Sequence, residues 1–160
     1  MAGYLPKPVS SFHKIPNTKI AIVAAMWHRD CVEAMVQRAI DELIAVGVER
    51  NDISVHWIPG SLELPYAARV LFEKQAELDA VMAFGVVLKG ATTHDDSVIQ
   101  TVVEGFSHVA DRYHKPIINE VIGVTCVEDA EARSDDSIAN KGVEAVFALS
   151  ELLHWQRSLT

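Results

Sequence analysis

The chain has 160 residues, of which 49% are hydrophobic and 22% charged, and this composition is typical of one folded domain with a substantial core. Its formal net charge of −8 argues against nucleic acid as the main partner, because binding to a phosphate backbone requires clustered Lys and Arg. The sequence has no apolar run of the roughly 18 residues that a membrane span needs, and its two cysteines, Cys31 and Cys126, lack metal-ligand spacing. We therefore expect a cytoplasmic protein that does not enter a membrane.

The first segment, residues 1–18, contains three prolines and shows no hydrophobic periodicity. It is expected to form an extended arm in front of a single domain at residues 19–160. Such an arm is either a loose tail or a strand that is added to a neighbouring chain.

Two strand–helix units follow the arm. Residues 19–25 form a short apolar run that predicts a buried parallel strand. Asp30 is expected to cap the next helix, whose apolar positions recur every three or four residues, and Gly47 is placed to end it. Residues 52–58 predict a second strand, and Pro65 falls in the first turn of the helix that follows, where proline is tolerated.

The second half of the chain continues this alternation. Residues 79–88 are the third and most apolar predicted strand, and a long helix follows His94. One face of this helix comprises Ile99, Val102, Val103, Phe106, Val109, Ala110 and Tyr113, and Pro116 is expected to stop the helix. The remaining segments are predicted as a fourth strand, a short acidic helix, a polar loop and a last helix, at residues 117–125, 128–133, 134–142 and from Val143 onward. The pattern predicts a single-domain, three-layer α/β/α fold with a parallel four-stranded sheet.

Residues 85–94 (GVVLKGATTH) join the third strand to the long helix. The free N–H groups at a helix start attract anions, and small residues let a phosphate approach the backbone. Histidine side chains titrate near neutral pH, so His94 could transfer protons there. The sequence thus predicts an anion pocket with an acid–base group, although a simple N-cap at Thr92 or Thr93 with a surface histidine is the alternative.

Two other strand exits carry polar or aromatic residues. Ligands of open parallel sheets bind outside the carboxyl ends of the strands. Trp27 offers an aromatic plane there, and Ser61, Leu62 and Glu63 offer a hydrogen-bonding edge, which suits a flat polar heterocycle meeting a phosphorylated partner. Trp27 could instead be a packing residue, and Glu63 a first-turn acid that is stabilised by the helix dipole.

Familiar cofactor and metal motifs are missing from the sequence. No glycine triplet follows the first strand, and no GxxxxGK[ST] motif is present. His94, Asp95 and Asp96 do not form a metal cluster on a helix, because residues one and two apart do not share a face. We expect neither a cofactor nor a metal.

Two long motifs, WIPGSLELP at 57–65 and GVVLKGATTH at 85–94, resemble those of the lumazine synthase family, together with Arg133 and the Asn-Lys-Gly of residues 140–142. The similarity runs from about residue 19 to the last helix. It implies a flavodoxin-like fold and a homo-oligomer, a pentamer or a pentamer-based assembly with shared active sites.

The resemblance also implies a reaction without metal or organic cofactor. Lumazine synthases condense 5-amino-6-(D-ribitylamino)uracil with 3,4-dihydroxy-2-butanone 4-phosphate, which gives 6,7-dimethyl-8-ribityllumazine, the riboflavin precursor. His94 matches the proton-transfer residue. By the same resemblance, Trp27 matches the residue that stacks on the pyrimidine, and the segment that binds the pyrimidine and its ribityl chain matches Ser61, Leu62 and Glu63. The strand end against the ring matches Val86, Val87 and Leu88, and the phosphate cradle matches Ala91 and Thr92. The positions contributed by the adjacent subunit match Asn119, Arg133 and Lys141.

Three positions depart from the family pattern. Asp95 replaces the usual aromatic after the histidine, Asn119 replaces an aromatic, and Glu120 stands where glycine is common. Acids near a phosphate site could weaken phosphate binding if they point inward. Two alternatives to the synthase therefore stay open: a catalytically weak protein of the same fold that binds lumazine or flavin, and a shell-forming protein.

Overall fold

Four parallel strands form the centre of the molecule, in the order β2-β1-β3-β4. The structure is a computed structural model that describes residues 5–91 and 93–160. The strands span Ile20–Ala25 (β1), Ile53–Ile58 (β2), Ala80–Leu88 (β3) and Ile117–Val124 (β4). Each lies within one residue of its predicted bounds, and the parallel sheet confirms the predicted fold class.

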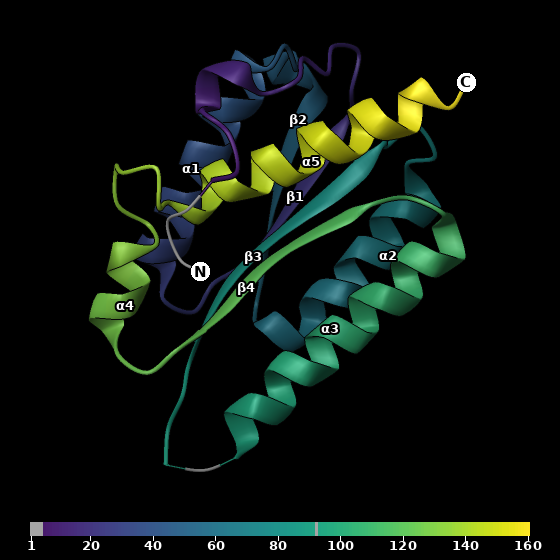
Figure 1. Cartoon of the computed structure of the whole chain (residues 1–160). Coiled ribbons are helices and arrows are strands. Elements are labelled where there is room, and N and C mark those ends of the chain that lie inside the picture. The colour runs from purple at the N-terminus through teal and green to yellow at the C-terminus, as the bar shows by residue number, and fades with distance from the viewer. Residues whose placement is uncertain (1–4, 92) are drawn as a thin grey trace.

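Helices cover both faces of the sheet, which makes three layers (Figure 1). One face carries α1 (Arg29–Ala45) and α5 (Lys141–Ser158), and the other carries α2 (Leu64–Lys74) and α3 (His94–Tyr113). The short α4 (Val127–Ala132) follows the end of β4, and 3₁₀ turns occur at Val9–Ser11, Arg50–Asp52 and Ser61–Glu63. Within the described residues, no helix is both long and apolar enough to cross a membrane.

The two central strands, β1 and β3, are buried on both faces. Alternate side chains of a strand point to opposite sides, so Met82 and Phe84 of β3 pack toward α1 and α5, while Val81 and Ala83 pack toward α2 and α3. All six residues of β1 are buried. β4 is only partly buried and has one neighbour, β3, because it forms an edge of the sheet.

The structure corrects two predicted helix starts. Asp30 does not cap α1: the helix begins at Arg29, and the N-cap His28 has left-handed backbone angles (φ 55°, ψ 46°). Asp30 instead lies in the first turn, where its charge still favours the helix dipole. The predicted polar loop also ends early, since Lys141 and Gly142 already belong to α5, whose N-cap Asn140 accepts a hydrogen bond from the Gly142 N–H at 2.8 Å.

Two predicted helix ends are confirmed. Gly47, with φ 97°, follows the last turn of α1 and donates to the carbonyl of Ile44 at 3.0 Å. α3 ends at Tyr113, three residues before Pro116. Val103 lies at the margin of the apolar stripe of α3, because it is 46% exposed.

The described part of the N-terminal segment packs on its own chain. Phe12 and Ile15 are buried in the same hydrophobic cluster as the apolar residues of α1 and α5. Lys14 donates to the Ala45 carbonyl at 2.5 Å, and the Arg157 guanidinium donates to the Pro16 carbonyl at 3.1 Å. The segment is therefore held against its own chain by both apolar packing and hydrogen bonds.

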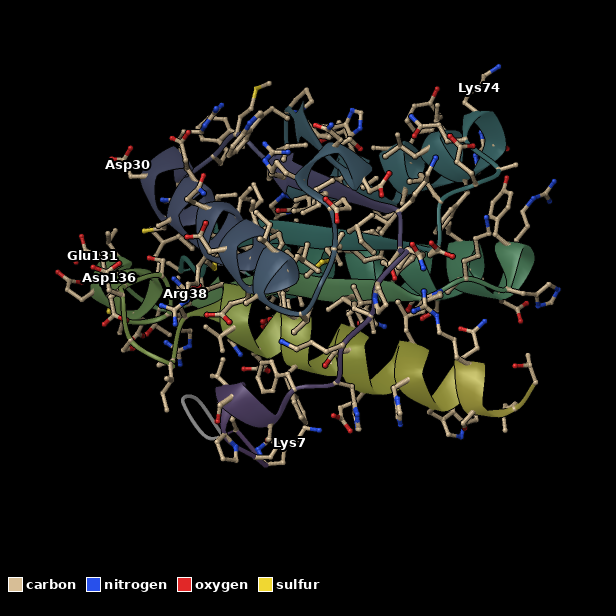
Figure 2. All side chains as sticks on the ribbon, turned by 90° about the horizontal axis from the view of Figure 1, so that it is seen from above. Lys7, Asp30, Arg38, Lys74, Glu131 and Asp136 are labelled. Atoms are coloured by element: carbon tan, nitrogen blue, oxygen red, sulfur yellow. The ribbon has the colours of Figure 1, made fainter. Side chains whose placement is uncertain are left out.

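α1 and α5 approach each other closely at Gly142. A Cβ built there would lie 2.4 Å from the Met35 carbonyl oxygen and 2.7 Å from the Ala39 nitrogen. Arg38 of α1 also donates to the backbone carbonyl of Asp136, in the segment that leads into α5, at 2.9 Å (Figure 2). The crossing therefore depends on a residue without a side chain.

We predict that Gly142→Ala destabilises the protein by about 1–3 kcal/mol, because the new methyl group collides with the backbone of α1. Urea unfolding measures this change in the free energy of unfolding. Gly90→Ala is the matched control, since the nearest atom to its Cβ is a carboxylate oxygen at 3.4 Å. Equal stability of the two variants would contradict the argument.

Candidate active site

The carboxyl end of β3 and the start of α3 lie at one end of the sheet (Figure 1). A cavity of about 440 Å³ lies there, lined by residues that follow β1, β2 and β3 and by the first residues of α3. Parallel strands place their carboxyl ends at one edge, so residues from three distant parts of the sequence converge there. The lining residues are Trp27, His28, Gly60, Ser61, Leu62, Glu63, Val86, Val87, Leu88, His94, Asp95 and Val98.

Trp27 forms one wall of this cavity. Its side chain is 72% exposed, so it contributes little to the packing of its own chain. The loop that carries it is held on either side: the Met26 N–H donates to the Ile58 carbonyl at 3.0 Å, and the Arg29 guanidinium stacks 3.3 Å from the centre of the Trp57 ring. This arrangement suits a stacking surface for a planar ligand better than it suits a core residue.

Ser61 and Glu63 form a second wall, and two glycines let them approach the backbone. A Cβ at Gly85 would lie 2.7 Å from the Ser61 hydroxyl oxygen, and a Cβ at Gly60 would lie 2.8 Å from a Glu63 carboxylate oxygen. Larger residues at either glycine would displace these polar groups. The cavity therefore combines an aromatic face with a hydroxyl and a carboxylate.

His94 lies at the mouth of the cavity, as the first residue of α3, and its side chain is exposed. The next residue, Asp95, also lines the cavity, and its carboxylate accepts a hydrogen bond from the Gly90 N–H at 2.5 Å. Asp96 points elsewhere and pairs with Lys89 at 3.3 Å. Both acids thus hold the loop between β3 and α3.

Eight predicted site residues share this cavity: Trp27, Ser61, Leu62, Glu63, Val86, Val87, Leu88 and His94. Ala91 is exposed in the adjoining loop, and Thr92 lies outside the described residues. The other three, Asn119, Arg133 and Lys141, are not among the described residues that line the cavity. The roles assigned to all of them stay predictions.

Arg133 and Lys141 belong to a separate polar cluster near the N-terminus of α5. The backbone N–H of Lys141 donates to the Arg133 carbonyl at 2.8 Å. The side-chain ammonium of Lys141 lies 2.7 Å from the Glu144 carboxylate and 3.9 Å from the Glu120 carboxylate. The Arg133 guanidinium donates to the carbonyl of Asp129 at 2.9 Å.

Glu120 is buried in this cluster, with only 8% of its surface exposed. Its pKa is raised to about 8, mainly by burial and also by the nearby Glu144 carboxylate, while Lys141 lowers it in part. Glu120 therefore binds a proton at neutral pH.

Asn119 lies on the opposite face of β4 from this cluster. Ile118 and Ile122 pack toward α5, so the alternation of the strand turns Asn119 to the α3 side, where it is exposed. It pairs in register with Ala83, whereas the cavity begins at Val86. The predicted site residues of one chain therefore lie partly at the cavity and partly along or after the edge strand β4, on both of its faces.

A second cavity of about 440 Å³ lies along β2 and α2. It shares Glu63 with the first, but its walls are mostly apolar, from Ile58, Pro59, Tyr66, Ala67, Val70 and Leu71, with His56. Fewer polar groups converge on it, so the cavity beside His94 is the better candidate for chemistry.

Comparison with known proteins bears on this geometry directly. The family model for 6,7-dimethyl-8-ribityllumazine synthase matches residues 17–157. The chain belongs to this family. A 6,7-dimethyl-8-ribityllumazine synthase of Leuconostoc mesenteroides is 34% identical over 138 residues, which cover 86% of this chain and 88% of the relative. Membership of the lumazine synthase family makes the protein an enzyme, a transferase of riboflavin biosynthesis.

Sequence reasoning assigned no binding role to four lining residues of this family member: His28, Gly60, Asp95 and Val98. His28 and Gly60 stand at predicted strand exits, and Asp95 was considered as a metal ligand and as a departure from the family pattern. Val98 follows His94 by four residues, so helical spacing could have placed both on one side of α3.

We predict that Glu120→Gln removes a pH dependence of stability. The native pKa of Glu120, about 8, lies above its ordinary value of 4.5, so the native state binds the extra proton between these values. Its contribution to the free energy of unfolding is complete below about pH 4.5 and is lost as the pH rises through 8.

The glutamine variant should therefore gain stability over the original chain as the pH rises from 5 to 9, by on the order of 1–3 kcal/mol. Urea unfolding at both pH values measures this difference, and Glu128→Gln, an exposed acid on α4, is the control. A stability difference that is the same at pH 5 and pH 9 would contradict the buried proton.

Proposed function

We propose that this enzyme condenses 5-amino-6-(D-ribitylamino)uracil with 3,4-dihydroxy-2-butanone 4-phosphate, releasing phosphate and water to form 6,7-dimethyl-8-ribityllumazine. One observation carries the proposal: eight residues that match the family's site line a single cavity at the strand ends. The family model and the relative support the same reaction.

The walls of the cavity suit the two substrates. The exposed indole of Trp27 can stack on the pyrimidine, while Ser61 and Glu63 can hydrogen-bond its polar edge and the ribityl chain. The start of α3, beside Ala91, offers free N–H groups to the phosphate. Val86, Val87 and Leu88 supply the apolar floor against the ring.

His94 is the proton-transfer group in this proposal. An imine forms between the amine of the pyrimidine and the ketone, phosphate leaves by elimination, and ring closure follows, so protons move in several steps. Acid–base help from one histidine is typically worth about 10²–10⁴ in rate. Holding two substrates in register contributes more, on the order of 7–11 kcal/mol at best.

The second set of residues completes the site from a neighbouring chain. Asn119, Arg133 and Lys141 lie on or after the edge strand β4, away from the cavity of their own chain. A cyclic homo-oligomer can bring this edge to the cavity of the adjacent subunit. We infer a pentamer, or an assembly of pentamers, in which Arg133 of the partner subunit binds the substrate phosphate.

The direct test supplies both substrates to the purified protein and follows lumazine fluorescence. The original chain should turn over, and His94→Asn should be slower by roughly tenfold to a thousandfold with pyrimidine binding near normal, because only proton transfer is lost. His108→Asn, on the exposed side of α3, is the control. Binding of lumazine without any turnover by the original chain would replace the synthase with a binding protein.

Subunit mixing tests the shared site. His94→Ala and Arg133→Ala, each inactive alone, are denatured, mixed in equal amounts and refolded. Random assembly gives intact pairs at about a quarter of the interfaces, so activity should return toward that fraction if adjacent subunits contribute the two residues.

The original chain, taken through the same cycle, controls for refolding, and native mass spectrometry verifies mixed rings. Mixed rings that remain inactive would mean that both residues serve the same subunit.

A further inference from the structure

Two acidic side chains at the start of α3 bind the loop between β3 and α3, and they bind different groups of it. The Asp95 carboxylate accepts the Gly90 N–H at 2.5 Å and lines the cavity beside His94. Asp96 pairs with Lys89 at 3.3 Å and is not part of the described cavity wall. The backbone N–H of Gly90 is therefore already bound by a carboxylate of the same chain.

We propose that Asp95 is an internal competitor of the substrate phosphate and sets the affinity of the enzyme for phosphorylated ligands. The inference rests on the proposed function, since it assumes that a phosphate binds beside Ala91. A carboxylate and a phosphate are both anionic acceptors, and one N–H cannot bond well to both. The phosphate must therefore displace Asp95 from Gly90, or bind beside its negative charge.

Asp95 touches Gly90 but is not locked in place by burial. Gly90 and Asp95 are in close contact, since a Cβ built on Gly90 would lie 3.4 Å from the same carboxylate oxygen. The Asp95 side chain is only half-buried, so it has room to turn toward solvent when a stronger anion arrives. Asp95 thus acts as a specificity-determining residue rather than a catalytic one.

If the contact between Gly90 and Asp95 has only a structural role, the opposite effect on phosphate binding is expected. If the bond from Gly90 to Asp95 only shapes the loop, removing the side chain should loosen the loop and weaken phosphate binding. Asn can still accept the Gly90 N–H through its amide oxygen but carries no charge. Asp95→Asn and Asp95→Ala together therefore separate competition from loop support.

The test uses inorganic phosphate as the probe in calorimetric titrations of the full-length protein at one pH and ionic strength. Competition predicts that Asp95→Asn and Asp95→Ala both bind phosphate about five- to thirtyfold more tightly than the original chain. Asp96→Asn, which removes the same charge from the same turn, should change the affinity less than about threefold. Steady-state kinetics should show a lower KM for the phosphorylated substrate in Asp95→Asn, with an unchanged KM for the pyrimidine.

Three results would overturn the inference: weaker phosphate binding by Asp95→Ala, equal tightening by the Asp95→Asn and Asp96→Asn variants, or affinities that do not change. Turnover by the original chain reports on the proposed reaction separately. Turnover without the tightening rejects only the role of Asp95, whereas tightening without turnover keeps the competition and rejects the reaction.

Discussion

The burial of β1 and β3 on both faces is the constraint on which the rest of the structure depends. A parallel sheet whose central strands are covered on both sides needs a helix after each strand, and each helix must return the chain to the same end of the sheet. All four carboxyl ends therefore lie along one edge. The cavity exists because Trp27, Ser61 and His94 each follow a different one of these ends.

The same constraint separates the two sets of predicted site residues. β1 and β3 occupy the centre of the sheet, so the loops after them can share one cavity with the loop after β2. β4 lies at the edge, and the segment after it continues away, through α4 and back to α5. Arg133 and Lys141 remain in that segment, tied to each other by a backbone hydrogen bond. In the proposed oligomer, a neighbouring subunit joins the two sets.

In the proposed reaction, an acidic protein has to bind a phosphorylated substrate. With a net charge of −8, the molecule offers no general attraction for an anionic substrate. Three cations that lie in or near the predicted site segments have acidic neighbours within one chain: Lys89 has Asp96, Arg133 has Asp129 and Lys141 has Glu144. In the proposed reaction, the affinity for a phosphate that binds at Gly90 reflects the difference between its contacts and the one that Asp95 already makes there.

The sequence by itself determined the alternation of strands and helices, the layers, and the three strand exits that meet at the cavity, because hydrophobic periodicity and the rule for parallel sheets are local or topological. Helix starts were less certain, since the left-handed turn at His28 and the Asn140 cap depend on how the chain leaves a packed strand or loop. Only the tertiary structure decided that Trp27 is exposed, that Asp95 binds Gly90 and that Glu120 is buried beside Lys141. Exposure, hydrogen-bond partners and pKa shifts depend on how side chains lie in the folded chain, so no sequence pattern contains them, even for partners as close as Gly90 and Asp95.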